Sequence, residues 1–278
     1  MNFCAFLLNR VSFRWNIKKK IPEFVLTTDY FRRDHLHVSM KQDLQNPLRG
    51  VKVLWGQPDS GKSTTTYRVV NELIENHHFR GVIFTKGNEC NYKSFTQWYE
   101  SILPTAGRLS DSLTVGSPLL IFVDHAEEII QDKEDLALIK SLAQESVEKK
   151  SFVLMFSTKS LDTAESILSL NGAKKVKAIG STNGPCFDIT FDAAMGVAKQ
   201  YKEIRNLKIS SNDLEIIAAA AVVSKSFGTV VGVLSDLSPD TCYLSKLIVQ
   251  NIQENAQEQH IEWKNGRERL QKYYPLGK

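Results

Sequence analysis

Cysteine is scarce in this chain of 278 residues, and no two cysteines are close together in sequence. The four are Cys4, Cys90, Cys186 and Cys242, and no C-x-x-C pair occurs. A small secreted domain built on disulfides has a denser pattern, so we expect reduced thiols in an intracellular, cytoplasmic protein. The six histidines form no ligand spacing with these cysteines, which argues against a zinc site.

A long hydrophobic run is also missing. The longest, IIAAAAVV at 216–223, is far shorter than the roughly 20 residues that span a bilayer, so we expect a buried helix and no membrane span. The composition, 42% hydrophobic and 24% charged, is ordinary for a globular protein. A net charge of +4 neither requires nor excludes a nucleic-acid partner.

Acidic residues are absent before Glu23. The basic residues of that stretch follow the short apolar run FCAFLL, whereas a secretory signal places its charges before the apolar run. An acid-free start that contains arginine fits mitochondrial targeting. The simpler interpretation is a flexible basic N-terminal arm over residues 1–29.

Apolar runs do alternate with amphipathic stretches between residues 51 and 192. PLLIFVD at 118–124 is apolar almost throughout, which predicts a strand covered on both faces, as in a parallel sheet with helices on each side. Helices between successive strands indicate right-handed α/β units. We expect strands at 51–55, 81–85, 118–124, 151–157 and 186–191, and helices at 62–76, 93–103 and 133–148.

Single residues predict two of these helix ends. Pro104 indicates that the second helix stops before it, and Asp132 is the expected N-cap of the third. After Asp192 the pattern is helical throughout. We expect helices at 192–206, 211–226 and 240–257, and a charged helix after Glu262. The predicted fold class is therefore α/β, a parallel sheet with helices on both faces, followed by a smaller all-α C-terminal domain.

The stretch GQPDSGKST fits the phosphate-loop pattern G-x-x-x-x-G-K-[ST], between the predicted strand VKVLW and an amphipathic helix. Gly56 and Gly61 permit turns that point backbone N–H groups at phosphate oxygens, and the helix N-terminus adds its dipole. Lys62 is expected to reach the β- and γ-phosphates and Ser63 to bind Mg²⁺. We expect the Asp59 carboxylate to point out to solvent, away from the phosphates. The predicted nucleotide-binding residues are Gly56, Gln57, Pro58, Asp59, Ser60, Gly61, Lys62, Ser63 and Thr64.

Two further strands end in polar residues at the edge where open α/β sheets bind ligands. Asp124 ends LLIFVD and is expected to hold Mg²⁺ through water. Glu127 and Glu128 follow at once, and one of them is the expected base that activates the attacking water, although both would also favour a helix start. Ser157 and Thr158 end the strand SFVLMFS and are either sensors of the γ-phosphate or an ordinary strand end.

At this point the chain resembles the P-loop ATPases with an additional strand between the two Walker motifs, and within them the AAA+/STAND branch. YFRRDHLHVSMKQDL at 30–44 is similar to the helix before the Walker A strand, and DHAEE at 124–128 is similar to the STAND form of Walker B. The resemblance implies ATP and Mg²⁺ as ligands, slow hydrolysis, an ATPase core at 30–192, and a helical lid with C-terminal helices at 193–278.

The chain departs from the AAA+ pattern at the lid. SKSFGTVVGVL at 224–234 has no arginine where many AAA+ proteins have one that senses the γ-phosphate, and contains Lys225 instead. Arg108 and Arg205 are candidate arginine fingers by charge alone. A nucleotide-dependent switch or motor is the favoured function. The alternatives are a DNA-binding helper in replication or transposition, a non-hydrolysing nucleotide-binding scaffold, and a small-molecule or nucleotide kinase. A protein client, self-association or nucleic acid remains open as the partner.

Overall fold

The computed structural model describes residues 34–45, 50–79, 81–111, 118–170, 176–178 and 189–273. The expected N-terminal arm lies outside the described residues. Among those described, no helix is long and apolar enough to cross a membrane.

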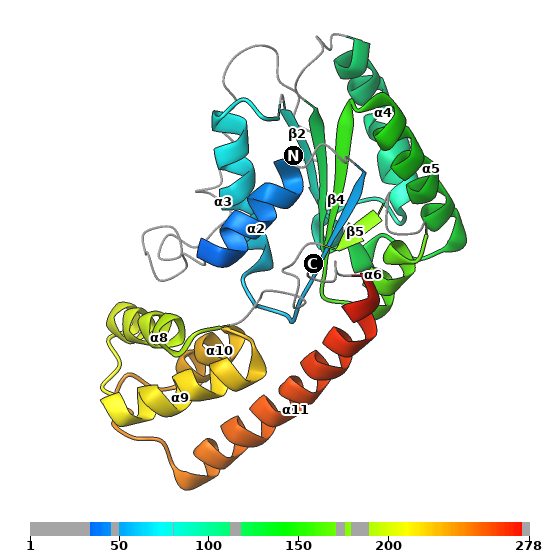
Figure 1. The fold of residues 1–278 in the computed structure, drawn as a ribbon. Helices are drawn as coiled ribbons and strands as arrows, with labels where there is room; N and C mark the ends of the chain where they lie inside the picture. Colours follow the sequence, from blue (N-terminus) through cyan, green and yellow to red (C-terminus); the bar gives the residue numbers. More distant parts are fainter. Residues whose placement is uncertain are drawn as a thin grey trace.

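A five-stranded sheet forms the centre of the α/β part, and all its pairings are parallel (Figure 1). Its strand order is β2-β3-β4-β1-β5. The strand that leads into the phosphate loop, β1, is therefore separated by β4 from β3, the strand that ends in Asp124. The strands are β1 (Val51–Trp55), β2 (Gly81–Lys86), β3 (Leu119–Asp124), β4 (Phe152–Thr158) and β5 (Val176–Ala178).

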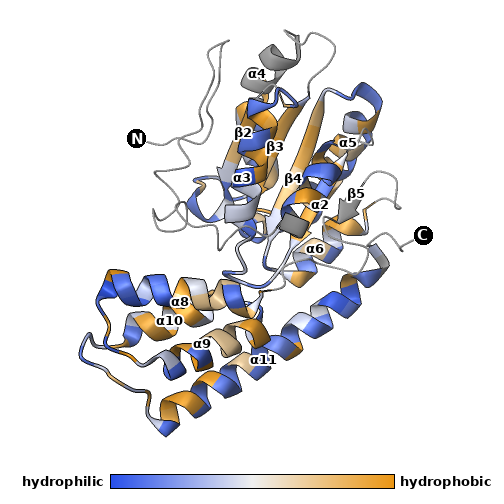
Figure 2. Cartoon of the chain, turned by 60° about the vertical axis from the view of Figure 1, so that its left-hand side comes forward, coloured by the Kyte–Doolittle hydropathy of each residue, from blue (hydrophilic) through white to orange (hydrophobic). Residues whose placement is uncertain are grey.

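Alternate residues of each strand face opposite sides of the sheet. A strand that is apolar throughout therefore contributes side chains to the hydrophobic core on each face. Leu120 and Phe122 of β3 pack with the helices on one face, whereas Ile121 and Val123 pack on the other. Figure 2 shows the hydrophobic strands between these helical layers. The first face is covered by α2 (Asp34–Gln45) and α3 (Lys62–Glu75), and the second by α4 (Phe95–Asp111), α5 (Lys133–Lys149) and α6 (Leu161–Leu168).

A separate hydrophobic cluster holds the C-terminal helices together. The last helix also reaches the α/β part: Ile252 and Ala256 pack in the helical cluster, whereas Trp263 and Leu270 pack against the sheet. One continuous helix therefore links the two parts, as Figure 1 shows. The helices are α8 (Phe191–Arg205), α9 (Ser211–Ser224), α10 (Gly228–Asp236) and α11 (Lys246–Leu270).

The predicted fold class is confirmed, and so is the Asp132 cap, whose side chain accepts a hydrogen bond from the Asp135 N–H. The fifth strand was placed wrongly. It lies at Val176–Ala178, and Phe191 instead begins α8 behind Thr190, whose hydroxyl caps the helix by accepting from the Ala193 N–H. Residues 186–188 of the expected strand lie outside the described residues.

Two helix ends also differ from expectation. Helix α4 continues through Pro104 to Asp111, because a proline removes only one helical N–H, and the preference it imposes on its neighbour is a bias that a longer helix can overcome. The two helices expected at the C-terminus form the single helix α11, since no glycine or proline interrupts residues 257–262. The short helix α10 lies within the expected lid but had not been predicted as a helix.

Candidate functional site

The phosphate loop connects β1 to α3 and has the backbone that its glycines predict. Gly61 has φ 83°, in the left-handed region, and immediately precedes Lys62, the first residue of α3. No side chain caps this helix start, so its first N–H groups are available to an anion. Asp59 is also left-handed, with φ 53°. The residue is exposed, but its carboxylate lies against the start of α10 rather than pointing out to solvent as expected.

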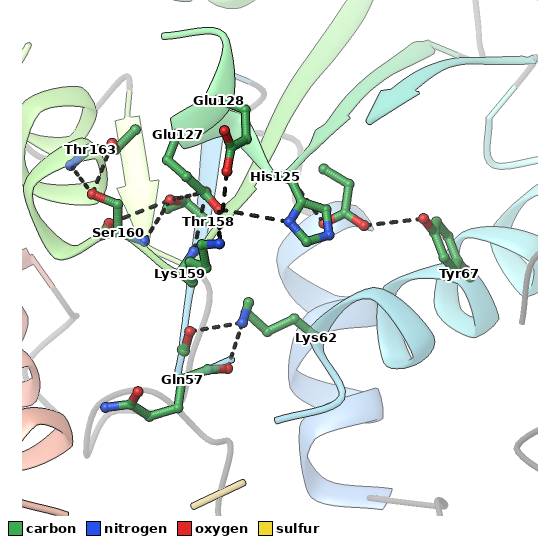
Figure 3. A network of polar contacts seen from close by, with 12 residues as sticks. Gln57, Lys62, Tyr67, His125, Glu127, Glu128, Thr158, Lys159, Ser160 and Thr163 are labelled. Carbon is green, nitrogen blue, oxygen red and sulfur yellow. Dashed lines mark hydrogen bonds and ion pairs between the residues drawn. The ribbon is translucent and has the colours of Figure 1, made fainter. Parts of the chain in front are cut away.

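The Lys62 ammonium is buried under the loop. Its Nζ donates hydrogen bonds to the carbonyl oxygens of Gly56 (2.8 Å) and Gln57 (2.7 Å), as Figure 3 shows. Burial lowers the pKa of Lys62 to about 8, although the charges of Asp124 and Glu127 oppose this shift. An ammonium in such a place gains from a nearby anion, because the anion offsets the cost of burying the charged form.

The Asp124 carboxylate is held from two sides at the end of β3. One oxygen accepts from the His125 N–H (3.1 Å) and the other from the Tyr67 hydroxyl (3.1 Å). Burial, followed by the charge of Asp124, raises the pKa of Tyr67 well above its usual range, so the phenol remains a donor. Sequence reasoning missed Tyr67. Its signal was the four-residue spacing from Ser63, which places both residues on one face of α3.

Glu127 and Glu128 lie in a short 3-10 turn, Ala126–Glu128, and have different surroundings. The Glu127 side chain is 9% exposed and that of Glu128 is 45% exposed. Glu127 accepts hydrogen bonds from the Thr158 hydroxyl (2.6 Å) and the Lys159 N–H (3.3 Å). The Lys159 Nζ lies 3.9 Å from Glu127 Oε1 and 3.8 Å from Glu128 Oε1. Sequence reasoning missed Lys159, which follows the predicted sensors directly.

His125 occupies a left-handed backbone position, with φ 53°, between Asp124 and the two glutamates. Its Nδ1 lies 3.7 Å from Glu127 Oε1, and this contact raises the pKa of His125. Burial by itself would raise the pKa of Glu127, but the contacts with His125 and the Thr158 hydroxyl lower it to about 2. The two side chains thus lie together in the turn after β3 and form an ion pair when His125 is protonated (Figure 3).

A cavity of about 480 Å³ brings most of these residues together. This volume lies within the usual range for small-molecule sites. Its walls are the phosphate loop, the ends of β3 and β4, and the apolar lid side chains Val197, Phe227 and Val231. The residues predicted for the site that line it are Pro58, Asp59, Gly61, Lys62, Ser63, Thr64, Asp124, Ser157 and Thr158.

Five predicted residues lie outside this lining. Gly56, Gln57 and Ser60 are buried in the loop itself, and the glutamates stand behind Thr158 and Lys159. Ser60 and Ser157 each have a buried hydroxyl with no hydrogen-bond partner in the described part of the chain. Ser157 also belongs to the cavity wall. Of the candidate arginine fingers, Arg205 is at the end of α8 and is not among the described residues that line the cavity, and the Arg108 side chain lies outside the described residues.

The predicted P-loop α/β fold is confirmed: β4 stands between β1 and β3, the phosphate loop joins β1 to α3, and a helical part follows the sheet. The predicted resemblance to AAA+ proteins concerns the fold alone. No family model and no curated protein matches the sequence.

Solved structures do match, at low sequence identity. A variant of RuvB from Thermotoga maritima is 15% identical, with 82% of this chain and 69% of that chain covered and a TM-score of 0.44. Domain III of the replication initiation protein DnaA from Thermotoga maritima is 10% identical (84% and 92% covered, TM-score 0.46). Rhizobiales Trip13 is 14% identical (84% and 92% covered, TM-score 0.46). These likenesses concern the fold alone.

Proposed function

We propose that this chain is a P-loop ATPase that binds ATP with Mg²⁺, hydrolyses it, and uses the nucleotide state as a switch or motor. One observation carries the proposal: a phosphate loop, two polar strand ends and an apolar lid wall line the same cavity. Each wall suits a different part of ATP. The loop and Lys62 suit the phosphates, and the side chains of Val197, Phe227 and Val231 suit the base and ribose.

The metal would be bound mainly through the nucleotide. In the described part of the chain, no group of three or more His, Cys, Asp or Glu side chains could hold an ion. Mg²⁺ commonly takes only one or two protein ligands, together with water and substrate phosphates. Ser63 and Asp124 both line the cavity and fit that role, with Tyr67 orienting the Asp124 carboxylate. Bound there, the ion would neutralise charge that develops on the phosphates.

We propose Lys159 in the role of the arginine that residues 224–234 of the lid lack. Lys62 and Lys159 are the two lysines of the cavity lining: Lys62 begins α3 after β1, and Lys159 follows the neighbouring strand β4. The Lys159 ammonium is held by Glu127 and Glu128 at distances near 4 Å, so a short movement of a long side chain would bring it to the phosphates. We propose that it senses the γ-phosphate, together with the buried Ser157 hydroxyl.

Glu127 is the better candidate for the base. Thr158 and Lys159 both line the cavity and both contact Glu127, whereas Glu128 is largely exposed. In this arrangement its carboxylate is bonded to Thr158 rather than directed at the cavity. We propose that bound nucleotide draws Lys159 away and frees the carboxylate to accept the proton of the attacking water.

Binding is tested by titrating ATP·Mg²⁺ into the wild type and into Lys62→Ala, with Lys140→Ala, an exposed lysine of α5, as the matched control. Loss of the buried ammonium should weaken affinity roughly tenfold to a hundredfold, the equivalent of about 1.5–3 kcal/mol for a charged hydrogen bond. Saturating ATP should raise the melting temperature of the wild type and of the control. Equal affinity in all three proteins would refute the proposed site.

Hydrolysis is tested separately by measuring phosphate release from the wild type and from Lys159→Gln. We expect slow release from the wild type and slower release from the variant, while Lys159→Arg retains most of the rate. ATP binding without any phosphate release would favour the non-hydrolysing scaffold instead.

A further inference from the structure

The phosphate loop and the lid are joined by two hydrogen bonds at a single point, and a third bond within the lid turn supports them. The Ser226 hydroxyl donates to the Pro58 carbonyl (2.9 Å), and the Phe227 N–H donates to the Asp59 carbonyl (3.1 Å). The Gly228 N–H in turn donates to the Ser226 hydroxyl (3.1 Å). Two exposed residues of the loop thus hold the turn that starts α10.

The side chain of Asp59 reinforces this junction. A Cβ atom placed on Gly228 would lie 2.6 Å from Asp59 Oδ2 and 3.0 Å from Ser226 Oγ. The carboxylate therefore lies in direct contact with the first residue of α10, and a Cβ there would require the carboxylate or the turn to shift. This helix has no side-chain cap from its own N-cap residue, Phe227, so an anion at its N-terminus is favourable.

The junction fixes the apolar wall of the cavity. Phe227 is the residue between Ser226 and Gly228, and Val231 follows one turn into α10, where its N–H donates to the Phe227 carbonyl (3.0 Å). Both side chains line the cavity, as do Pro58 and Asp59 of the phosphate loop. The bonds from Ser226 and Phe227 and the contact of Asp59 with Gly228 thus hold the turn that carries this wall next to the loop.

We propose that Asp59 and Gly228 are a positioning pair that holds the lid wall over the base of a bound nucleotide. The proposal rests on the proposed nucleotide site and adds a specific role to an acid that is otherwise unfavourable beside a polyanion. Turned toward α10, the Asp59 carboxylate stabilises the helix start and is kept away from the phosphates.

If the pair positions the lid wall, Gly228→Ala should weaken binding of the base but not binding of the phosphates. The added Cβ of Gly228→Ala would meet the Oδ2 and Cβ atoms of Asp59. We expect the turn that carries Phe227 and Val231 to move away from the loop as a result, so that these side chains pack less well on the base. We expect the affinity for a fluorescent ATP analogue to fall about tenfold, which corresponds to about 1.4 kcal/mol. The affinity for inorganic tripolyphosphate with Mg²⁺ should remain within about twofold of the wild type, about 0.4 kcal/mol.

Rescue identifies Asp59 as the partner. Asp59→Gly removes the obstructing atoms and suits the left-handed backbone of that position, so the cost of Gly228→Ala should be clearly smaller in the Asp59→Gly background. Gly232→Ala is the matched control in the same helix, because a Cβ there meets no atom within 4 Å. Equal losses in both backgrounds, or unchanged ATP affinity of Gly228→Ala, would overturn the proposal. So would an equal loss of tripolyphosphate binding.

Hydrogen exchange in the nucleotide-free protein tests the same pair without any ligand. Gly228→Ala should speed the exchange of the Phe227 amide, which the Asp59 carbonyl now protects, and Asp59→Gly should reduce this effect. If the wild type bound no ATP, the proposed function would be wrong. The exchange measurement would still show whether Asp59 and Gly228 act as a pair, because it needs no ligand. Unchanged exchange in Gly228→Ala would reject this pairing.

Discussion

The Thr158 hydroxyl donates a 2.6 Å hydrogen bond to Glu127, and this bond joins the end of β4 to the turn that follows β3. The carboxylate it holds has a pKa of about 2, which makes it a weak base. General bases work best with a pKa near the working pH. For the base role proposed above, Glu127 would have to exchange its bond to Thr158 for one to water.

Turnover should distinguish the two glutamates. Glu127→Gln keeps the shape of the side chain and removes the base, so we expect ATP hydrolysis to fall by about 10²–10⁴-fold, the usual contribution of general base catalysis. Glu128→Gln, at an exposed position, should retain most of the activity. Phosphate release measured at saturating ATP provides the comparison, and nucleotide affinity should stay similar in both variants. A larger loss in Glu128→Gln would transfer the role to that residue.

The low pKa of Glu127 also predicts a dependence of stability on pH. The folded-state pKa of about 2 lies below the ordinary value of 4.5, so the contacts of the carboxylate stabilise the fold above pH 4.5. This stabilisation is lost as the pH falls from about 4.5 toward 2. The whole effect is at most about 3 kcal/mol, of which about 1 kcal/mol is lost by pH 3.5.

Urea unfolding at pH 6 and at pH 3.5 measures this loss. The wild type should lose more free energy of unfolding between the two pH values than Glu127→Gln does, by about 1 kcal/mol. Glu128→Gln should behave as the wild type, because its carboxylate is exposed. The same pH dependence in the wild type and in Glu127→Gln would show that the contacts of this carboxylate contribute nothing to stability.

The sheet and the phosphate loop could be predicted because their signals are local. An apolar strand, two glycines and a lysine at fixed spacing specify a backbone shape wherever they occur, and Asp132 caps its helix through a neighbour three residues away. The misplaced fifth strand has the same origin. CFDITF alternates like a strand, but Thr190 is a better helix cap, and the cap determined where α8 starts.

The contacts that the sequence did not reveal join residues far apart in the chain. Tyr67 bonds Asp124, and Ser226 bonds Pro58 across 168 positions. Such pairs depend on how the sheet is ordered and how the lid folds back, which no spacing within one motif encodes. The exposure of Asp59 could be predicted from charge repulsion alone, whereas its contact with Gly228 could not.

Asp135 provides a test of the α/β part away from the cavity. Its carboxylate is fully buried and accepts from the Thr96 N–H (2.8 Å), the Thr96 hydroxyl (2.8 Å) and the Gln131 N–H (3.2 Å). Asp135→Asn places an amide donor against one of these donors, so we expect a loss of about 2–3 kcal/mol in free energy of unfolding. Removing the cap by Asp132→Ala should cost only about 1 kcal/mol. Chemical denaturation of the two variants should preserve this order, and a smaller loss in Asp135→Asn would contradict it.

Gly266 of α11 lies directly on Trp55, the residue before the phosphate loop. A Cβ at this glycine would lie 2.4 Å from two atoms of the indole ring, and the ring is buried. Gly266→Ala should therefore displace either the helix or the ring, at a cost of about 1–3 kcal/mol in free energy of unfolding. Gly232 lies within α10, and a Cβ there meets no atom within 4 Å. Gly232→Ala should therefore raise the free energy of unfolding by up to about 1 kcal/mol, because alanine favours helices.

The same substitution in two helices should thus have opposite signs in urea unfolding. Because Trp55 is followed directly by Gly56, Gly266→Ala should also weaken ATP binding, an effect that Gly232→Ala lacks. If Gly266→Ala unfolded at the same urea concentration as the wild type and bound ATP equally well, α11 would not press on the phosphate loop. A loss of stability with unchanged ATP affinity would instead mean that the Trp55 ring shifts without moving Gly56. In that case α11 would contribute to stability but not to nucleotide binding.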